Sequence, residues 1–207
     1  MKTSILAALA ASTVSARLGF GDCPKVELQP NFDGERHAGQ WYEAKRDKLF
    51  TWEFGQECGT QSYRKNSRGN YDLYFRAYVW MAGFSYVGAG GELRQCGTSN
   101  DWTCQATMGE DKYAADKKTS AINILATDYD NWSVMYVCSE NGMGMHAKWL
   151  AISARTGKIS DSALAEAEAA VAKQLPDFDL SNWSMWNTSH EDCEYDWNKW
   201  ENEGMMY

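Results

Sequence analysis

The chain has 207 residues, of which 20 are lysine or arginine and 28 are aspartate or glutamate, giving a formal net charge of -8. Its length suits one domain or at most two small ones, and a hydrophobic fraction of 44% is enough for a packed core. Because an acidic surface repels phosphate backbones, the composition argues against nucleic acid as a partner.

Residues 1–16 have the pattern of a secretory signal peptide. Lys2 supplies a positive start, residues 5–11 form a short apolar run, and Val14-Ser15-Ala16 fits the small-x-small rule for cleavage. The run is shorter than the ~20 apolar residues that a membrane helix needs, and no later segment is long enough. We therefore expect a secreted, extracellular protein with no membrane span; the alternative is a buried N-terminal helix.

The cysteine content is typical of a disulfide-bonded secreted protein. The cysteines are Cys23, Cys58, Cys96, Cys104, Cys138 and Cys193. An even count behind a signal peptide predicts disulfides, although spacing alone does not choose the pairs. No Cys-x-x-Cys motif or Cys/His cluster is present, so no metal site is expected. Sequons at Asn131, Asn182 and Asn187 favour a secreted glycoprotein.

The central part of the chain is rich in strand-forming residues broken by Gly, Asn and Asp. Eight strands are predicted at hairpin-like intervals, over residues 41–45, 60–64, 71–80, 84–94, 102–108, 120–126, 132–139 and 146–152. This spacing indicates an all-β antiparallel barrel or sandwich and not βαβ units.

One helix is expected after the strands. Ser160-Asp161-Ser162 can cap it, and Leu164, Ala167, Val171 and Leu175 fall on one helical face before Pro176. Such a stripe predicts a helix lying on the wall of the sheet. Residues 194–207 form a Trp-rich acidic tail that we expect to be partly disordered, so the barrel domain should span residues 17–193.

Three separated motifs together resemble those of the lipocalin family. They are Gly39-Gln40-Trp41-Tyr42-Glu43 after Asn31-Phe32-Asp33, then Thr127-Asp128-Tyr129, then Arg155-Thr156 before the helix. Within that family the chain is most similar to the apolipoprotein D and bilin-binding group. The resemblance implies an eight-stranded up-and-down β-barrel, or calyx, with one C-terminal helix on its wall.

The same resemblance implies how the barrel is closed and cross-linked. Trp41 would lie across one end with Arg155 stacked on its ring. Disulfides Cys23–Cys138 and Cys58–Cys193 are implied, which leaves Cys96 and Cys104 to bridge the loop of residues 97–101.

A calyx of this kind would bind a small hydrophobic ligand without a covalent bond and without a required cofactor. In the segment 71–80 two alternating faces compete for the interior, and simple hydrophobicity favours Tyr71, Leu73, Phe75, Ala77 and Val79. The register of bilin-binding relatives favours the other face, and we adopt it here. The predicted ligand-binding residues are Tyr74, Arg76, Tyr78, Trp80, Phe84, Tyr86, Met135, Val137 and Trp149.

The nature of the ligand is left open by these residues. Ala147 would also point inward, and Gly88 and Gly90 would leave space for the ligand. Arg76 could pair with a ligand carboxylate, or it could lie exposed on the barrel wall. A bilin such as biliverdin is slightly favoured over a fatty acid, retinoid or sterol.

Other functions are alternatives to ligand carriage. One alternative is an enzyme on the lipocalin scaffold, of the isomerase or de-epoxidase type. The isomerase type needs a free inward thiol, whereas every cysteine here can pair, and the three histidines fit no triad, so we predict no catalytic residues and no enzyme. The Trp-rich tail could instead bind a receptor or a second copy of the chain.

Overall fold

The computed structural model describes residues 18–48, 56–79, 85–93, 121–140, 143–182 and 184–195, and for residues 85–93, 121, 122 and 139 only the backbone. Within these ranges the elements follow in the order β1 (Leu18–Phe20), α1 (Gly34–His37), β2 (Gly39–Asp47), β3 (Gln56–Lys65), β4 (Tyr71–Val79), β5 (Ser85–Leu93), β6 (Ala121–Thr127), β7 (Trp132–Glu140), β8 (Met145–Ala154), α2 (Asp161–Gln174) and β9 (Met185–Asn187).

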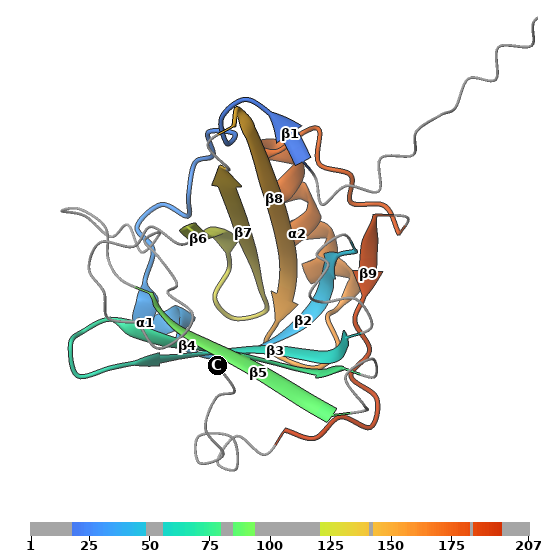
Figure 1. Cartoon of the computed structure of the whole chain (residues 1–207). Helices are drawn as coiled ribbons and strands as arrows, with labels where there is room; N and C mark the ends of the chain where they lie inside the picture. The colour runs from blue at the N-terminus through green and yellow to red at the C-terminus, as the bar shows by residue number, and fades with distance from the viewer. Residues whose placement is uncertain are drawn as a thin grey trace, which may run out of the picture.

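The strands form one antiparallel sheet in the order β5-β4-β3-β2-β8-β7-β6. Figure 1 shows β3, β4 and β5 in one layer and β6, β7 and β8 in another, with β2 joining the two layers. The sheet thus folds over on itself and has an inner face, which we define as the face that carries Trp41. This architecture confirms the predicted calyx; the strand predicted over residues 102–108 lies outside the described residues.

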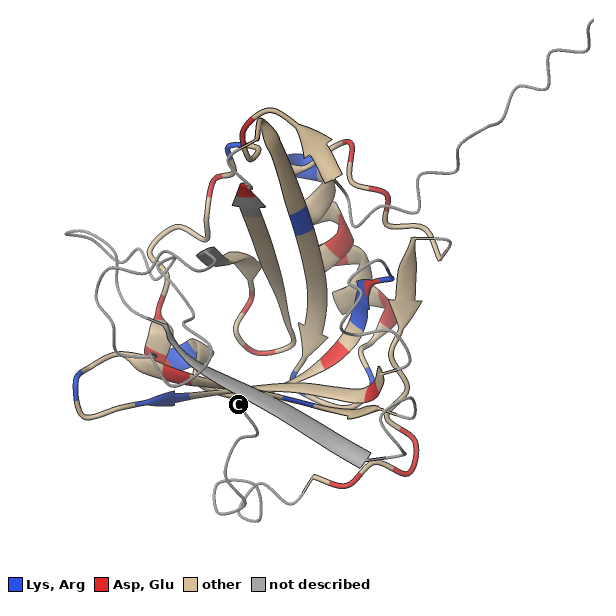
Figure 2. Cartoon of the chain, in the orientation of Figure 1, with Lys and Arg blue, Asp and Glu red and all other residues tan. Residues whose placement is uncertain are grey.

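Two apolar clusters lie on opposite faces of the sheet because the strands alternate. On β7 and β8, Met135 and Trp149 point to the inner face, whereas Val134 and Leu150 point to the outer face, where α2 packs. Figure 2 shows few charged residues on these two strands, and the sequence of each contains one, Glu140 on β7 and Lys148 on β8.

The helix predicted after the strands is confirmed as α2. The Ser160 hydroxyl accepts a hydrogen bond from the backbone N–H of Ala163 and caps the first turn. Ala163, Ala167 and Val171 are buried on one stripe against the outer face of the sheet. Neither described helix is long and apolar enough to cross a membrane.

Two disulfides attach the chain's outer segments to the sheet. Cys23 is bonded to Cys138 on β7, and Cys58 on β3 is bonded to Cys193, which confirms both implied pairs. Cys96 and Cys104 lie outside the described residues, as do residues 1–16 and 196–207. The sequence did not predict β1 and β9, the short strands that pair with β8 and β2.

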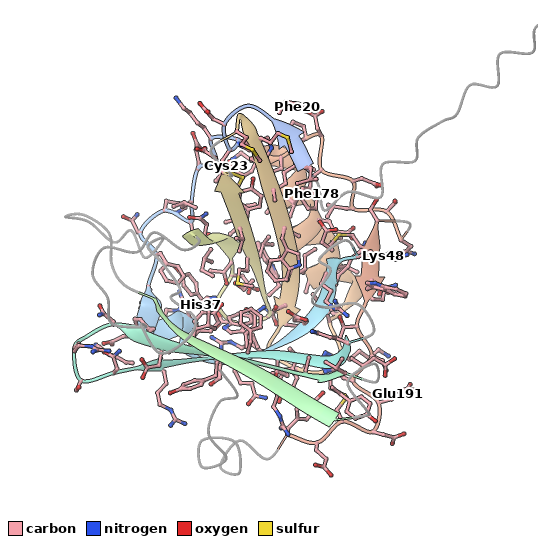
Figure 3. The ribbon with its side chains drawn as sticks, viewed as in Figure 1. Phe20, Cys23, His37, Lys48, Phe178 and Glu191 are labelled. Atoms are coloured by element: carbon pink, nitrogen blue, oxygen red, sulfur yellow. A yellow bond between two sulfur atoms is a disulfide. The ribbon has the colours of Figure 1, made fainter. Side chains whose placement is uncertain are left out.

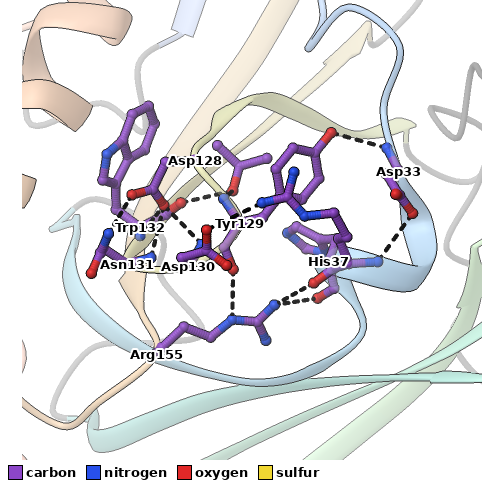
Figure 4. Close-up of polar contacts among 10 residues, drawn as sticks. Asp33, His37, Asp128, Tyr129, Asp130, Asn131, Trp132 and Arg155 are labelled. Atoms are coloured by element: carbon purple, nitrogen blue, oxygen red, sulfur yellow. Dashed lines mark hydrogen bonds and ion pairs between the residues drawn. The ribbon is translucent and has the colours of Figure 1, made fainter.

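One end of the calyx is closed by Arg155, whose hydrogen bonds to the carbonyl oxygens of Tyr129 and His37 are drawn in Figure 4. Its guanidinium carbon lies 3.8 Å from the centroid of the Trp41 ring, as the resemblance implied. The same side chain donates hydrogen bonds to the carbonyl oxygens of Arg36 at 2.7 Å, Ala38 at 3.0 Å and Tyr129 at 2.9 Å. One side chain therefore joins α1, the entry to β2 and the β6–β7 turn.

The β6–β7 turn is preorganised to meet Arg155. The Asp128 carboxylate accepts hydrogen bonds from the backbone N–H groups of Asp130, Asn131 and Trp132. These bonds hold the pKa of Asp128 below its usual value even though burial acts in the opposite direction. Tyr129 is held at a φ of 70°, so its carbonyl faces the guanidinium.

We predict that Arg155→Lys lowers the free energy of unfolding by about 3 kcal/mol, because lysine cannot reproduce the planar fork and leaves several carbonyls without a donor. Urea unfolding measures the change. Arg36→Lys is the control, since Arg36 is half exposed and pairs with exposed Asp130, and it should cost less than about 1 kcal/mol. Equal losses for the two variants would contradict the role given to Arg155.

Candidate binding site on the inner face

The floor of the inner face is a layer of rings next to the Arg155 closure. The His37 ring lies 4.9 Å from Trp41, 4.7 Å from Tyr63 and 5.1 Å from Phe32, centroid to centroid. Figure 3 labels His37 at the end of α1, beside the lower layer of the sheet. Its Nε2 lies 2.9 Å from the hydroxyl of Ser133 on β7, so the ring bridges α1 and the opposite layer.

His37 is neutral in the folded protein at physiological pH. Burial, followed by the nearby positive charge of Arg155, lowers its pKa from 6.5 to about 3. A protonated ring here would be desolvated and would face a cation. The floor of the calyx is therefore uncharged.

Beyond the floor, the inner face is mostly apolar. The cluster that contains Trp41 also includes side chains from β3, β4, β6, β7 and β8, namely Tyr63, Tyr71, Leu73, Ile124, Met135, Trp149 and Ala151, with Phe75 and Val137 packed against it. Residues from both layers of the sheet thus contact one another across the interior.

A polar group interrupts this apolar lining. Glu43 on β2 accepts a hydrogen bond from the Gln61 amide at 3.3 Å, and the Tyr63 hydroxyl donates to Gln61 at 2.9 Å. The other carboxylate oxygen of Glu43 lies 3.9 Å from Nε of Arg46. Burial raises the pKa of Glu43, and the Arg46 charge opposes that rise.

A β-bulge in β2 brings Glu43 and Arg46 to the same face. Glu43 pairs with Ser153 of β8 and Lys45 pairs with Ile152, so two steps along β2 match one step along β8. Lys45 is therefore turned to the outer face, where it binds Glu168 of α2 at 2.6 Å. Strict alternation from Trp41 would have placed Lys45 inside, which is why sequence reasoning missed Arg46.

The structure corrects the predicted register of β4. Tyr71 and Leu73 belong to the inner cluster with Met135 and Trp149, and Phe75 packs against it. Tyr74, Arg76 and Tyr78 alternate with them and occupy the opposite face. Simple hydrophobicity therefore identified the inner face, and the register borrowed from bilin-binding relatives was wrong.

With β4 in this register, the predicted site residues divide into those on the inner face, those on the outer face and those outside the described residues. Met135 and Trp149 lie in the inner cluster and Val137 packs against it, on the face that was predicted. Gly88 and Gly90 pair with Arg76 and Tyr74, so they belong to the outer face and leave no space inside. Trp80, Phe84 and the side chain of Tyr86 lie outside the described residues.

The described residues contain no group of three or more His, Cys, Asp or Glu that could hold a metal ion. The four described cysteines are joined in disulfides. What the inner face offers is apolar contact area with a few buried hydrogen-bonding groups, a combination typical of small-molecule sites.

Comparison with known proteins gives relatives in sequence and in structure. Apolipoprotein D of Cavia porcellus is 29% identical over 136 residues, which are 66% of this chain and 67% of that protein. Apolipoprotein D of Bos taurus is 28% identical over 142 residues, or 65% and 66% of the two chains. Across the first three relatives the match spans between 59% and 67% of their length. No family model matches the chain.

Solved structures share the fold at low sequence identity. Apocrustacyanin C2 superposes with a TM-score of 0.66 and 18% identity, covering 86% of this chain and 94% of that one. Insecticyanin from the tobacco hornworm Manduca sexta gives a TM-score of 0.62 and 16% identity, covering 86% and 93%.

Because His37 is neutral in the folded protein, we predict that the free energy of unfolding falls as the pH is lowered. Because its folded pKa of about 3 lies below the ordinary value of 6.5, protons bind the unfolded chain preferentially as the pH falls below 6.5. His37→Gln keeps a side chain able to bond Ser133 and removes this titration. Between pH 7 and pH 5, wild type should lose about 2 kcal/mol more unfolding free energy than the variant. Parallel pH profiles from urea unfolding would show that His37 is not buried neutral.

Proposed function

Because the chain belongs to the lipocalin family, in the group of apolipoprotein D, we propose that it carries a small hydrophobic ligand bound without a covalent link against the inner face. The observation that supports this most is the apolar lining of Leu73, Phe75, Met135 and Trp149, next to an end closed by Arg155 and Trp41. Ligand affinity would come from burial of apolar surface at roughly 25 cal/mol per Å², less the cost of ordering the ligand.

We infer that the protein acts outside the cell and as a binder, not a catalyst. Its disulfides suit an oxidising compartment. Asn182 and Asn187 are exposed and so available to carry glycans, whereas the Asn131 amide is bonded to Asp128. A bilin is the favoured ligand on the resemblance alone. The alternative function is binding of a receptor or a second copy through the Trp-rich tail, most of which lies outside the described residues; exposed Trp186 on β9 offers a further contact for such a partner.

The test of carriage begins with protein purified from its native source. We expect mass spectrometry of the denatured extract to show a small apolar molecule at about one per chain, and an absorption spectrum to show visible bands if that molecule is a bilin. An empty extract, together with no change in tryptophan fluorescence on adding retinol, oleic acid or biliverdin, would contradict carriage.

The two faces of β4 give a matched pair of variants. Phe75→Ala removes apolar contact from the inner face, and the affinity for retinol should fall at least about tenfold, since removal of ~60 Å² of contact is worth about 1.5 kcal/mol. Tyr74→Ala, one residue away on the outer face, should leave the affinity within about twofold of wild type. Fluorescence titration measures both. A larger loss for Tyr74→Ala would restore the register first predicted.

A further inference from the structure

Two buried polar side chains on the inner face have hydrogen-bonding capacity that the described hydrogen bonds leave unused. Ser153 on β8 and Glu43 on β2 lie directly opposite each other in the ladder, and they are 2% and 3% exposed. The Ser153 hydroxyl has no hydrogen-bond partner among the described residues. Buried hydroxyls are nearly always bonded, so an open one calls for an explanation.

One carboxylate oxygen of Glu43 likewise has no described hydrogen bond. Gln61 donates to Oε1, whereas the described neighbour of Oε2 is Nε of Arg46 at 3.9 Å, which is beyond hydrogen-bond distance. Gly59 makes room for this carboxylate, because a Cβ at position 59 would overlap Oε2. The strand pairing thus holds an acceptor and a hydroxyl side by side within the apolar lining.

The charges of this cluster offset one another. Glu43 and Arg46 are both almost fully buried, and one negative and one positive group lie on the same face of β2. Figure 2 shows the acidic and basic residues that follow one another along β2. A ligand carboxylate placed here would add a second buried negative charge beside Glu43, which is costly, whereas a neutral group adds none.

We propose that Glu43 and Ser153, with Arg46 beside them, bind a neutral hydrogen-bonding group of the ligand, a hydroxyl or an amide-like N–H, which enters the calyx ahead of any charged end. The ligand donor would bond Oε2 of Glu43, and Ser153 would complete the second bond. This assignment rests on the carrier function proposed above and specifies its ligand class: an amphipathic molecule with an uncharged polar end. Arg76, on the outer face, does not select the ligand.

The test compares three probes that share one alkyl chain: dodecanol, dodecanoate and methyl dodecyl ether, titrated calorimetrically at neutral pH. Wild type should bind dodecanol about tenfold more tightly than the ether, which cannot donate, and more tightly than dodecanoate. Glu43→Gln should bring the alcohol and the ether to within about twofold. Ser153→Ala removes the donor to the ligand oxygen, which both probes present, and should weaken the alcohol and the ether alike by about fivefold. Glu57→Gln, the same change at an exposed residue of β3, should behave as wild type.

The outcomes distinguish the proposed polar cluster from the carrier function itself. If the acid binds as well as the alcohol, if Glu43→Gln keeps the full preference for alcohol over ether, or if Ser153→Ala binds dodecanol as wild type does, the proposed cluster is wrong while carriage stands. If none of the probes binds wild type, the cluster is also wrong, and carriage fails only if retinol, oleic acid and biliverdin are not bound either. Ser153→Ala should keep the wild-type thermal unfolding midpoint, since it deletes a hydroxyl that has no partner, so its result is independent of any folding defect in Glu43→Gln.

Discussion

The contact between Arg155 and Trp41 is the constraint on which the calyx depends. A guanidinium is unusual in offering a flat face to an aromatic ring and several N–H groups to carbonyls at the same time. Here it binds segments that are far apart in sequence, since α1 precedes β2 and the Tyr129 turn follows β6. Fixing these segments sets where β2 begins, and the position of β2 determines which of its residues face inward.

The two faces of β2 have different roles: the outer face packs against α2, and the inner face carries the polar group proposed to bind the ligand. Its bulge sends Lys45 to α2 and Arg46 to the interior, so adjacent cations serve opposite faces. The outer ion pair fixes the helix to the sheet, and the inner one gives the apolar lining a polar position without net charge. The uncharged floor around His37 complements it, because a protonated histidine there would upset the charge balance of the interior.

The sequence predicted those parts of the fold that depend on local chemistry or on a complete motif. The Ser160 cap, the α2 stripe and the Trp41–Arg155 contact were of this kind, as were the pairs Cys23–Cys138 and Cys58–Cys193 that the resemblance implied. The sequence-based prediction failed where a shift of one residue determines which face of a strand points inward. β4 carries aromatic residues on both faces, so Tyr74 and Phe75 competed, and the bulge at Glu43 and Lys45 has no signal of its own in the sequence. Ser153 was missed because a serine beside small apolar residues looks like ordinary strand.

The disulfides also determine how the protein would respond to mechanical load. A pull on the N-terminal end would peel the short β1 from β8 and then meet the bond between Cys23 and β7. A pull on the C-terminal end would reach Cys193 and pass through its bond to β3 before it could strip β9 from β2. Tension applied at either end is thus carried by covalent bonds into strands within the sheet, so the short strands β1 and β9 at its edges do not bear the load alone.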